Sequence, residues 1–303
     1  MGKGSIYGRF RGLPIAEAAL VSAIWASSFV GVKVALAYAG PFTIAALRYS
    51  IAALLLLPAL IPSRSRGGRG MGRIWPRLLG IGLAQYLIGN GALFFALTMV
   101  TPTEASLALC LTPIPVLALE FFYLKERTGL LHLLGIAIAM GGTVLFFSFG
   151  LQPVPAPAIG MLALATISFA FLPVFGREIA RTGAVSNTVL TGVPLAIGGG
   201  GLLLVALVVE GIPRLPPTGW GIVLGLAVVN TLAAYLLFNH ALRSLKAGEA
   251  NILLNLSPIG TALIAWGALG DRLTPFQMAA MAIAVIGVSL AQSRRIRPPY
   301  PIE

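Results

Sequence analysis

The chain has 303 residues, of which 57% are hydrophobic and 10% are charged, and its formal net charge is +12. A soluble domain carries about 25% charged residues, because a surface that faces water has to be polar. The composition therefore excludes a cytosolic enzyme, a secreted disulfide framework and a disordered tail, and it indicates a protein that crosses a membrane many times. A single cysteine, Cys110, permits no intramolecular disulfide.

Hydrophobic stretches of membrane-spanning length follow one another along the chain, separated by proline, glycine or charge. Ten transmembrane helices are predicted, at Ile15–Ala39, Phe42–Ile61, Leu78–Val100, Thr103–Leu124, Leu130–Phe149, Ile159–Ala180, Val185–Val209, Gly219–His240, Gly248–Leu269 and Pro275–Gln292. The connections are short, so neighbouring helices should be antiparallel and no connection can hold a catalytic domain. The first stretch is too long for the core of a signal peptide, so we expect it to remain as the first helix. The predicted fold class is an all-α polytopic membrane protein.

Lysine and arginine gather on one side of this predicted bundle. With the N-terminus in the cytoplasm, seventeen of them fall on the inner side and two, Arg214 and Arg272, on the outer side. This distribution satisfies the positive-inside rule and predicts that both termini are cytoplasmic. Because the charges lie between hydrophobic stretches, they set the orientation of the helices and do not indicate a nucleic-acid partner.

The chain contains an internal repeat. A shift of 145 positions brings Gln85–Leu145 into gapless register with Asn230–Leu290. The register aligns a glutamate, a mid-helix proline, an arginine and a glycine, a coincidence that apolar composition alone does not readily produce. The aligned pairs are Glu104 with Glu249, Pro113 with Pro258, Arg127 with Arg272, and Gly142 with Gly287. We therefore predict two homologous five-helix halves, residues 1–150 and 151–303.

An odd number of helices in each half has a topological consequence. The second half must enter the membrane from the side opposite to the first, which makes the two halves inverted repeats. Inverted repeats are the usual architecture of secondary transporters, in which the substrate site lies near the bilayer midplane between the halves. The repeat therefore predicts a transporter that works by alternating access.

Several short motifs resemble those of one known family. They are Trp25-Ala26-Ser27-Ser28-Phe29 with Lys33 in the first helix, Leu47-Arg48-Tyr49 in the second, Glu104-Ala105-Ser106 with Pro113 in the fourth, and Glu249-Ala250 with Pro258 in the ninth. In these motifs, and over nearly its whole length, the chain resembles the EamA-type family of the drug/metabolite transporter superfamily. The resemblance implies an inner-membrane permease, commonly an exporter of amino acids or other small metabolites. One departure is the Gly-Glu that usually ends the fourth helix of each repeat, which here is Lys125-Glu126 and Gly270-Asp271.

Polar side chains at mid-helix depth are the candidates for a solute site, because lipid would otherwise reject them. The repeat register pairs Gln85 with Asn230 and Asn90 with Tyr235, and amide and phenol groups can bind a zwitterion or a sugar without carrying charge. The alternative is that these groups form hydrogen bonds between helices and hold the bundle together. The predicted substrate-binding residues are Trp25, Ser28, Gln85, Tyr86, Asn90, Ser168, Asn230, Tyr235, Asn251 and Asn255.

A second set of residues is predicted to take part in coupling or gating: Glu104, Glu249, Pro113, Pro258, Lys33 and Arg48. The two glutamates begin helices, where backbone N–H groups stabilise a carboxylate, so capping is the simpler interpretation and a protonatable pair the functional one. The two prolines each remove a backbone hydrogen bond and permit a hinge. The two cations are expected near the outer ends of their helices, where they either snorkel to the interface or receive a substrate carboxylate.

Small residues in the predicted fifth and tenth helices favour close helix contact, either between halves or between protomers of a homodimer. The spacings are Gly135/Ala139, Ala137/Gly141 and Ala280/Ala284.

The sequence thus predicts a secondary-active transporter, with a small-molecule substrate and the lipid bilayer as its partners. The alternative is an intramembrane enzyme that acts on lipid-linked substrates, but no HExxH, Gly-x-Ser-x-Gly or P-loop motif is present. His132 and His240 lie at helix ends far apart in the sequence, so neither indicates a metal set. We therefore expect no enzyme activity, no cofactor and no metal.

Overall fold

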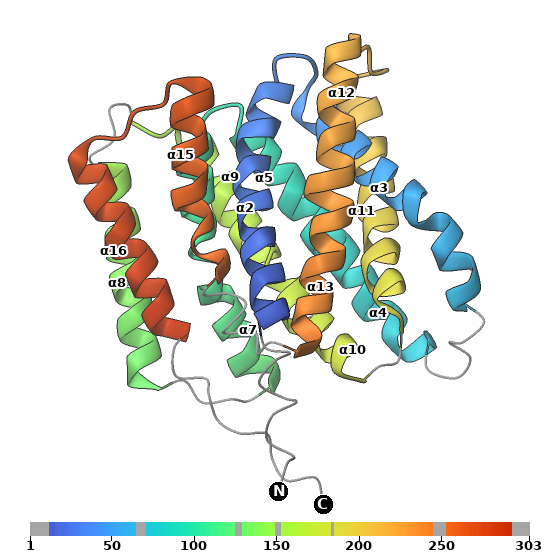
Figure 1. Cartoon of the computed structure of the whole chain (residues 1–303), viewed down its shortest axis with the longest axis horizontal. Coiled ribbons are helices and arrows are strands. Elements are labelled where there is room, and N and C mark those ends of the chain that lie inside the picture. The colour runs from blue at the N-terminus through green and yellow to red at the C-terminus, as the bar shows by residue number, and fades with distance from the viewer. Residues whose placement is uncertain are drawn as a thin grey trace, which may run out of the picture.

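The structure is a computed structural model that describes residues 12–64, 71–124, 129–148, 153–182, 185–244 and 253–292. Every regular element in these ranges is helical, and the helices form one bundle (Figure 1). Seven of the described helices are long and apolar enough to cross a membrane, and three shorter apolar helices lie at Leu133–Ser148, Ser257–Leu269 and Pro275–Ala291. Together they account for the ten predicted spans, so the all-α polytopic prediction is confirmed.

The first five spans make up the N-terminal half. They comprise α2 (Gly12–Ala35); α3 (Pro41–Arg64); α4 (Met71–Ile81) with the π-helix η1 (Gly82–Gly89) and α5 (Asn90–Ala96); α6 (Pro102–Leu109) with α7 (Pro113–Leu124); and α8 (Leu130–Ser148). The third span therefore starts earlier than predicted and contains Pro76 within α4. The fourth span is not one continuous helix, because it is interrupted before Pro113.

The last five spans make up the C-terminal half. They comprise α9 (Ala156–Ser168) with the π-helix η2 (Leu172–Gly176) and α10 (Arg177–Thr182); α11 (Asn187–Val209); α12 (Pro217–Gly225) with the π-helix η3 (Leu226–Ala233) and α13 (Ala234–Ser244); α15 (Ser257–Leu269); and α16 (Pro275–Gln292). Helix α15 ends where the sequence predicts a break, because Gly270 adopts a left-handed conformation with φ of 72°.

The two halves run in opposite directions through the bundle. Helix α2 starts at the lower edge of Figure 1 and rises, whereas the sixth span starts with α9 in the upper part and descends to α10 at the lower edge. The first helix of one half is therefore antiparallel to the first helix of the other, as the odd number of helices per half predicts. Large apolar side chains such as Leu204 and Val208 are exposed on the outside of the bundle, where lipid would cover them.

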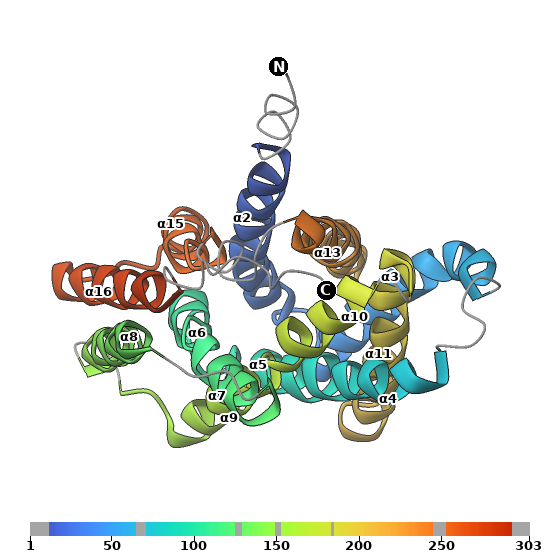
Figure 2. The ribbon, with the colours of Figure 1, turned by 90° about the horizontal axis from the view of Figure 1, so that it is seen from below.

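Small residues join α8 to α16, the last helices of the two halves, at one edge of the bundle (Figure 2). A Cβ atom added to Gly142 would lie 2.4 Å from the backbone nitrogen of Ala284, and one added to Gly287 would lie 2.3 Å from that of Ala139. The two backbones thus approach too closely for a larger side chain. The predicted small-residue contact holds the halves of one chain together, while Ala137 and Gly141 are exposed on the other face of α8.

A second contact between the halves lies at the start of α3. The carboxylate of Glu210, just after α11, accepts hydrogen bonds from the backbone nitrogens of Phe42 at 2.9 Å and Thr43 at 2.8 Å. It thereby caps two of the donors that a helix leaves unpaired at its N-terminus. Gly40 is required here, because an added Cβ would lie 2.2 Å from the carboxylate carbon of Glu210.

Candidate functional site

A cavity of about 200 Å³ lies in the bundle and is lined by residues of both halves. We call it the central cavity. Its aromatic lining comprises Trp25, Phe29, Tyr49, Phe94, Phe169, Tyr235 and Phe238. Its polar lining comprises Ser28, Arg48, Gln85, Asn90, Ser106, Thr112, Asn255 and Ser257. A concave apolar site with a few convergent polar groups is the usual form of a small-molecule site.

Two of the described π-helices lie at matching places in the repeat, and η1 contributes Gln85 to the cavity wall. Segment η1 lies in the third span of the first half, and η3 lies in the third span of the second. A π-turn disturbs the regular pattern of backbone bonds and leaves carbonyls for other donors, and such turns are frequent at functional sites. The Asn90 Nδ2 donates to the Gln85 carbonyl at 2.7 Å, and the Thr231 hydroxyl donates to the Leu226 carbonyl at 3.1 Å. The sequence does not reveal these π-helical segments.

Each half also contains a broken helix beside the cavity. Between α6 and α7 the carbonyl of Leu109 accepts a hydrogen bond from the Thr112 hydroxyl at 2.6 Å. The helical turn at residues 253–254 is likewise separated from α15. Pro113 and Pro258 both line the central cavity at these breaks. Discontinuous helices are how transporters bring free backbone groups to a buried site.

Arg48 lies deep in the bundle and lines the central cavity, with 4% of its surface exposed. Its Nε donates to the Thr231 hydroxyl at 2.5 Å, its Nη1 to the Ser28 hydroxyl at 2.7 Å and its Nη2 to the Asn230 carbonyl at 3.0 Å. The expected position near the outer end of the helix is therefore wrong, and the side chain does not snorkel. Hydroxyls and a carbonyl from α2 and η3 hold it inside instead.

The rings around Arg48 extend this network. The guanidinium carbon lies 5.4 Å from the centre of the Tyr49 ring and 5.8 Å from that of Phe94, both within cation–π range. The Tyr49 hydroxyl donates to the Asn90 Oδ1 at 2.5 Å. Neither Phe94 nor the place of Tyr49 in the cavity wall is predicted from the sequence, because an aromatic residue in an apolar helix is usually a packing residue.

The amide and phenol groups of the two halves come together in the cavity. The Tyr235 side chain interacts with Gln85 and Asn90, and its ring lies 5.3 Å from the ring of Tyr86. Three buried polar atoms of the lining have no hydrogen-bond partner among the described residues. They are Gln85 Oε1, Asn255 Nδ2 and Ser257 Oγ.

Some of the predicted substrate-binding residues do not line the cavity. Tyr86, Ser168 and Asn230 are buried but are not part of the described cavity wall. The Asn230 Nδ2 instead donates to the Ile24 carbonyl at 2.6 Å and to the Ser27 hydroxyl at 3.0 Å, which joins η3 to α2. Asn251 and Glu249 lie outside the described residues.

Lys33 and Glu104 lie at the end of the bundle opposite to the start of α2, and neither is in the described cavity wall. The Lys33 Nζ donates to the carbonyls of Leu97 at 2.7 Å and Val100 at 2.9 Å, beyond the end of α5. Glu104 forms a capping box with Thr101: its Oε2 accepts from the Thr101 nitrogen at 2.7 Å, and its own nitrogen donates to the Thr101 hydroxyl at 3.2 Å. Burial raises the pKa of the Asp271 carboxyl, and the charge of Lys33 partly opposes that shift.

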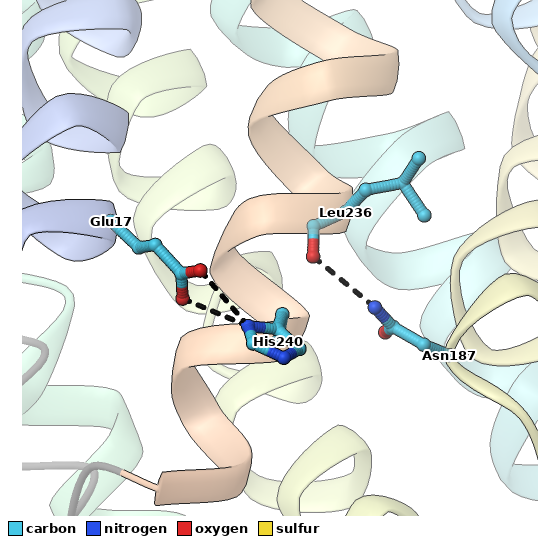
Figure 3. A network of polar contacts seen from close by, with 4 residues as sticks. All are labelled: Glu17, Asn187, Leu236 and His240. Carbon is cyan, nitrogen blue, oxygen red and sulfur yellow. Dashed lines mark hydrogen bonds and ion pairs between the residues drawn. The ribbon is translucent and has the colours of Figure 1, made fainter. Parts of the chain in front are cut away.

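An acid–base contact joins the halves near the start of α2 (Figure 3). The two carboxylate oxygens of Glu17 on α2 lie 3.0 and 2.9 Å from the Nδ1 of His240 on α13. Nearby, the Asn187 Nδ2 donates to the Leu236 carbonyl at 3.2 Å and joins α11 to α13. His240 is thus part of a helix-to-helix contact, an arrangement that sequence analysis did not foresee.

The model of the EamA-like transporter family matches residues 13–148 and 156–292, and the gap falls in the connection between α8 and α9. The chain is 25% identical to "Uncharacterized transporter YyaM" of Bacillus subtilis over 275 residues, which cover 88% of this chain and 89% of that protein. It is 26% identical to "Uncharacterized inner membrane transporter YedA" of Escherichia coli (strain K12) over 289 residues, which cover 92% and 90%.

A solved structure described as "Crystal structure of protein" has the same fold. It matches with a TM-score of 0.65 and 21% sequence identity, over 92% of this chain and 95% of that one.

Proposed function

Because the chain belongs to the EamA-like transporter family, and is a membrane transporter and not an enzyme, we propose that it is a secondary-active exporter of small organic metabolites such as amino acids. It works by alternating access at the central cavity. We place it in the inner (plasma) membrane with both termini cytoplasmic, in line with the description of the Escherichia coli relative as an inner membrane transporter and with the distribution of basic residues.

The observation that carries this proposal is the central cavity between two inverted halves. Its wall presents a buried acceptor on Gln85 and buried donors on Asn255 and Ser257 that no described protein group satisfies. A buried polar atom without a partner is costly, about 1–3 kcal/mol, and a bound solute would remove that cost. A bundle built only for stability would fill the same position with apolar side chains.

Alternating access requires parts that bend and contacts that break. The helix breaks at Pro113 and Pro258 give each half a hinge beside the solute. Lys33 closes the outer end by holding α2 to the carbonyls beyond α5, and the Glu17–His240 contact holds the inner ends of α2 and α13. Glu104 and Glu249 are the candidates for proton coupling, although the carboxylate of Glu104 already serves a cap.

The test is counterflow in proteoliposomes with a broad panel of labelled amino acids and small metabolites. We expect saturable exchange of some of these solutes. The variants Tyr235→Phe and Asn255→Leu should each lower kcat/KM about two- to tenfold, the effect of one neutral hydrogen bond. Tyr38→Phe is the matched control, because Tyr38 is exposed and does not line the described cavity wall.

The outcomes separate the parts of the proposal. No saturable exchange across the panel would count against a metabolite transporter. Unchanged kinetics in both cavity variants would remove the central cavity from the transport path. Flux that ignores an imposed pH gradient would exclude proton coupling through Glu104 or Glu249.

A further inference from the structure

Arg48 gives the central cavity a positive charge that the described protein does not neutralise. Resting on the proposed transport function, we propose that the cavity selects organic anions and that Arg48 binds the carboxylate of the solute. The solute class is a small carboxylate with an apolar or aromatic body.

Among the described residues, no negative charge balances the guanidinium of Arg48. The three hydrogen bonds of Arg48 go to two hydroxyls and one backbone carbonyl, all of them neutral acceptors. None of the described residues that line the cavity is acidic, and no described carboxylate lies within ion-pair distance of Arg48. A buried cation in a low-dielectric bundle attracts a counter-ion strongly. Since the described wall supplies none, the counter-ion comes from solution through the cavity.

The hydrogen bonds of Arg48 fix the position of its guanidinium and leave some of its N–H groups unused. The proton of the Thr231 hydroxyl goes to the Leu226 carbonyl, which leaves the hydroxyl oxygen to accept from Arg48 Nε. Arg48 has five N–H groups, and three are used, so one N–H remains on each terminal nitrogen. Two such donors suit the two oxygens of a carboxylate. The π-helix η3 thus fixes a guanidinium whose remaining donors are free for a solute.

The rest of the wall argues for an organic solute and not a small inorganic ion. Trp25, Phe29 and Phe238 offer apolar surface, which a chloride or phosphate ion would not use. The unpartnered Gln85 Oε1 accepts a hydrogen bond, so it suits a solute N–H or O–H group at a distance from the carboxylate. A cationic amine without a carboxylate would meet the charge of Arg48 and be repelled.

The sign of the electrostatic potential in the cavity can be measured at Cys110 without knowing the substrate. Cys110 is the only cysteine of the chain, and it lines the cavity. The full-length protein is labelled with two methanethiosulfonates, one carrying a sulfonate and one a trimethylammonium group. Each forms a mixed disulfide with the Cys110 sulfur and releases methanesulfinate, while the thiol proton goes to the solvent. The labelling rate of each reagent is divided by the rate at which the same reagent reacts with 2-mercaptoethanol, which corrects for the different intrinsic reactivities of the two reagents.

We expect the anionic reagent to label wild-type protein at least roughly tenfold faster than the cationic one on this corrected scale. Arg48→Gln should bring the ratio close to one, and Arg48→Lys should keep it above one. Arg214→Gln, which removes an exposed outer cation, should leave the ratio unchanged. Cys110→Ser gives the background. If Arg48→Gln fails to fold, the wild-type ratio and the lysine variant still decide the question.

A wild-type ratio of one or less would overturn anion selection and leave the transporter proposal standing. No labelling of the folded protein by either reagent, with full labelling after denaturation, would show that solutes do not reach this wall and would overturn both. Counterflow supplies an independent arm with phenylalanine, N-acetylphenylalanine and phenylalaninamide. Saturable exchange of the amide without exchange of either carboxylate would overturn anion selection, whereas exchange restricted to the carboxylates would support it.

Discussion

Two adjacent glycines of α8 provide a stringent test of how the halves are joined. Gly142 faces α16, and an added Cβ would lie 2.4 Å from the Ala284 nitrogen and 2.8 Å from its Cα. Gly141 faces away, and an added Cβ would have nothing within 4 Å. The same Gly→Ala substitution at the two positions therefore differs only in what the methyl group meets, since the gain in helix propensity is shared.

The expected magnitude follows from these distances. Ordinary contact begins at 3.4 Å, so Gly142→Ala must move α8 and α16 apart by about 1 Å. The obstructing atoms belong to the backbone, which cannot rotate away as a side chain can. Overpacking of this kind costs about 1–3 kcal/mol, and Gly141→Ala should be neutral or slightly stabilising.

The assay is thermal unfolding of the purified protein in detergent, followed by tryptophan fluorescence or by loss of the monodisperse peak in size-exclusion chromatography. Gly142→Ala should melt several degrees below Gly141→Ala, since a difference of 1 kcal/mol shifts the melting temperature of a large domain by about 2–4 °C. Equal melting temperatures for the two variants would show that α8 and α16 are not in backbone contact and would refute this reasoning.

Three further predictions address caps and charges. Glu210→Gln keeps the size of the side chain but removes its charge from the start of α3, so it should destabilise the protein by about 1 kcal/mol in thermal unfolding, and an unchanged melting temperature would contradict the capping role. Thr231→Val removes the acceptor for Arg48 Nε and the donor to Leu226, so it should shrink the Cys110 labelling ratio while leaving the fold intact; a ratio equal to that of wild type would show that Arg48 is held without it. Burial raises the pKa of the Asp271 carboxyl, so the folded protein binds that proton more tightly than the unfolded chain does. The folded protein therefore loses stability as the pH rises from the ordinary aspartate pKa through the raised pKa of Asp271. Asp271→Asn should therefore melt above wild type at neutral pH, and the gap should narrow as the pH falls toward the ordinary aspartate range; a gap that is absent or reversed at neutral pH would contradict the effect of burial.

The fold could be predicted from the sequence because the bilayer imposes a simple rule on length and polarity. Ten apolar stretches, an odd number per repeat and the alignment of Pro113 with Pro258 were enough to define the architecture and the opposite orientation of the halves. Helix ends were less predictable. Pro76, for example, lies inside α4, although proline in a sequence usually marks a boundary.

The site was predicted in part, and the misses have a common physical cause. Polar residues in a membrane helix stand out, so Gln85, Asn90, Tyr235 and Asn255 were found and the structure brings all four to the central cavity. Which way a polar side chain points depends on the local helical pitch, and the sequence does not show π-helices. Asn230 therefore turns toward α2 and supplies its backbone carbonyl to Arg48 instead.

The repeat duplicates the scaffold of the cavity but not its chemistry, and this difference bears on how a solute is held. Arg48 is the eighth residue of α3, and the eighth residue of α11, the corresponding helix, is Pro194. The guanidinium consequently has no counterpart in the other half among the described residues at that depth. In the proposed mechanism, a solute with one carboxylate would meet one guanidinium at one side of the cavity, so its orientation would be the same whichever end of the bundle is open. Under the proposed alternating access, the two packings of the halves would exchange around a solute that keeps its contact with Arg48, so the buried charge would not be left alone during the exchange.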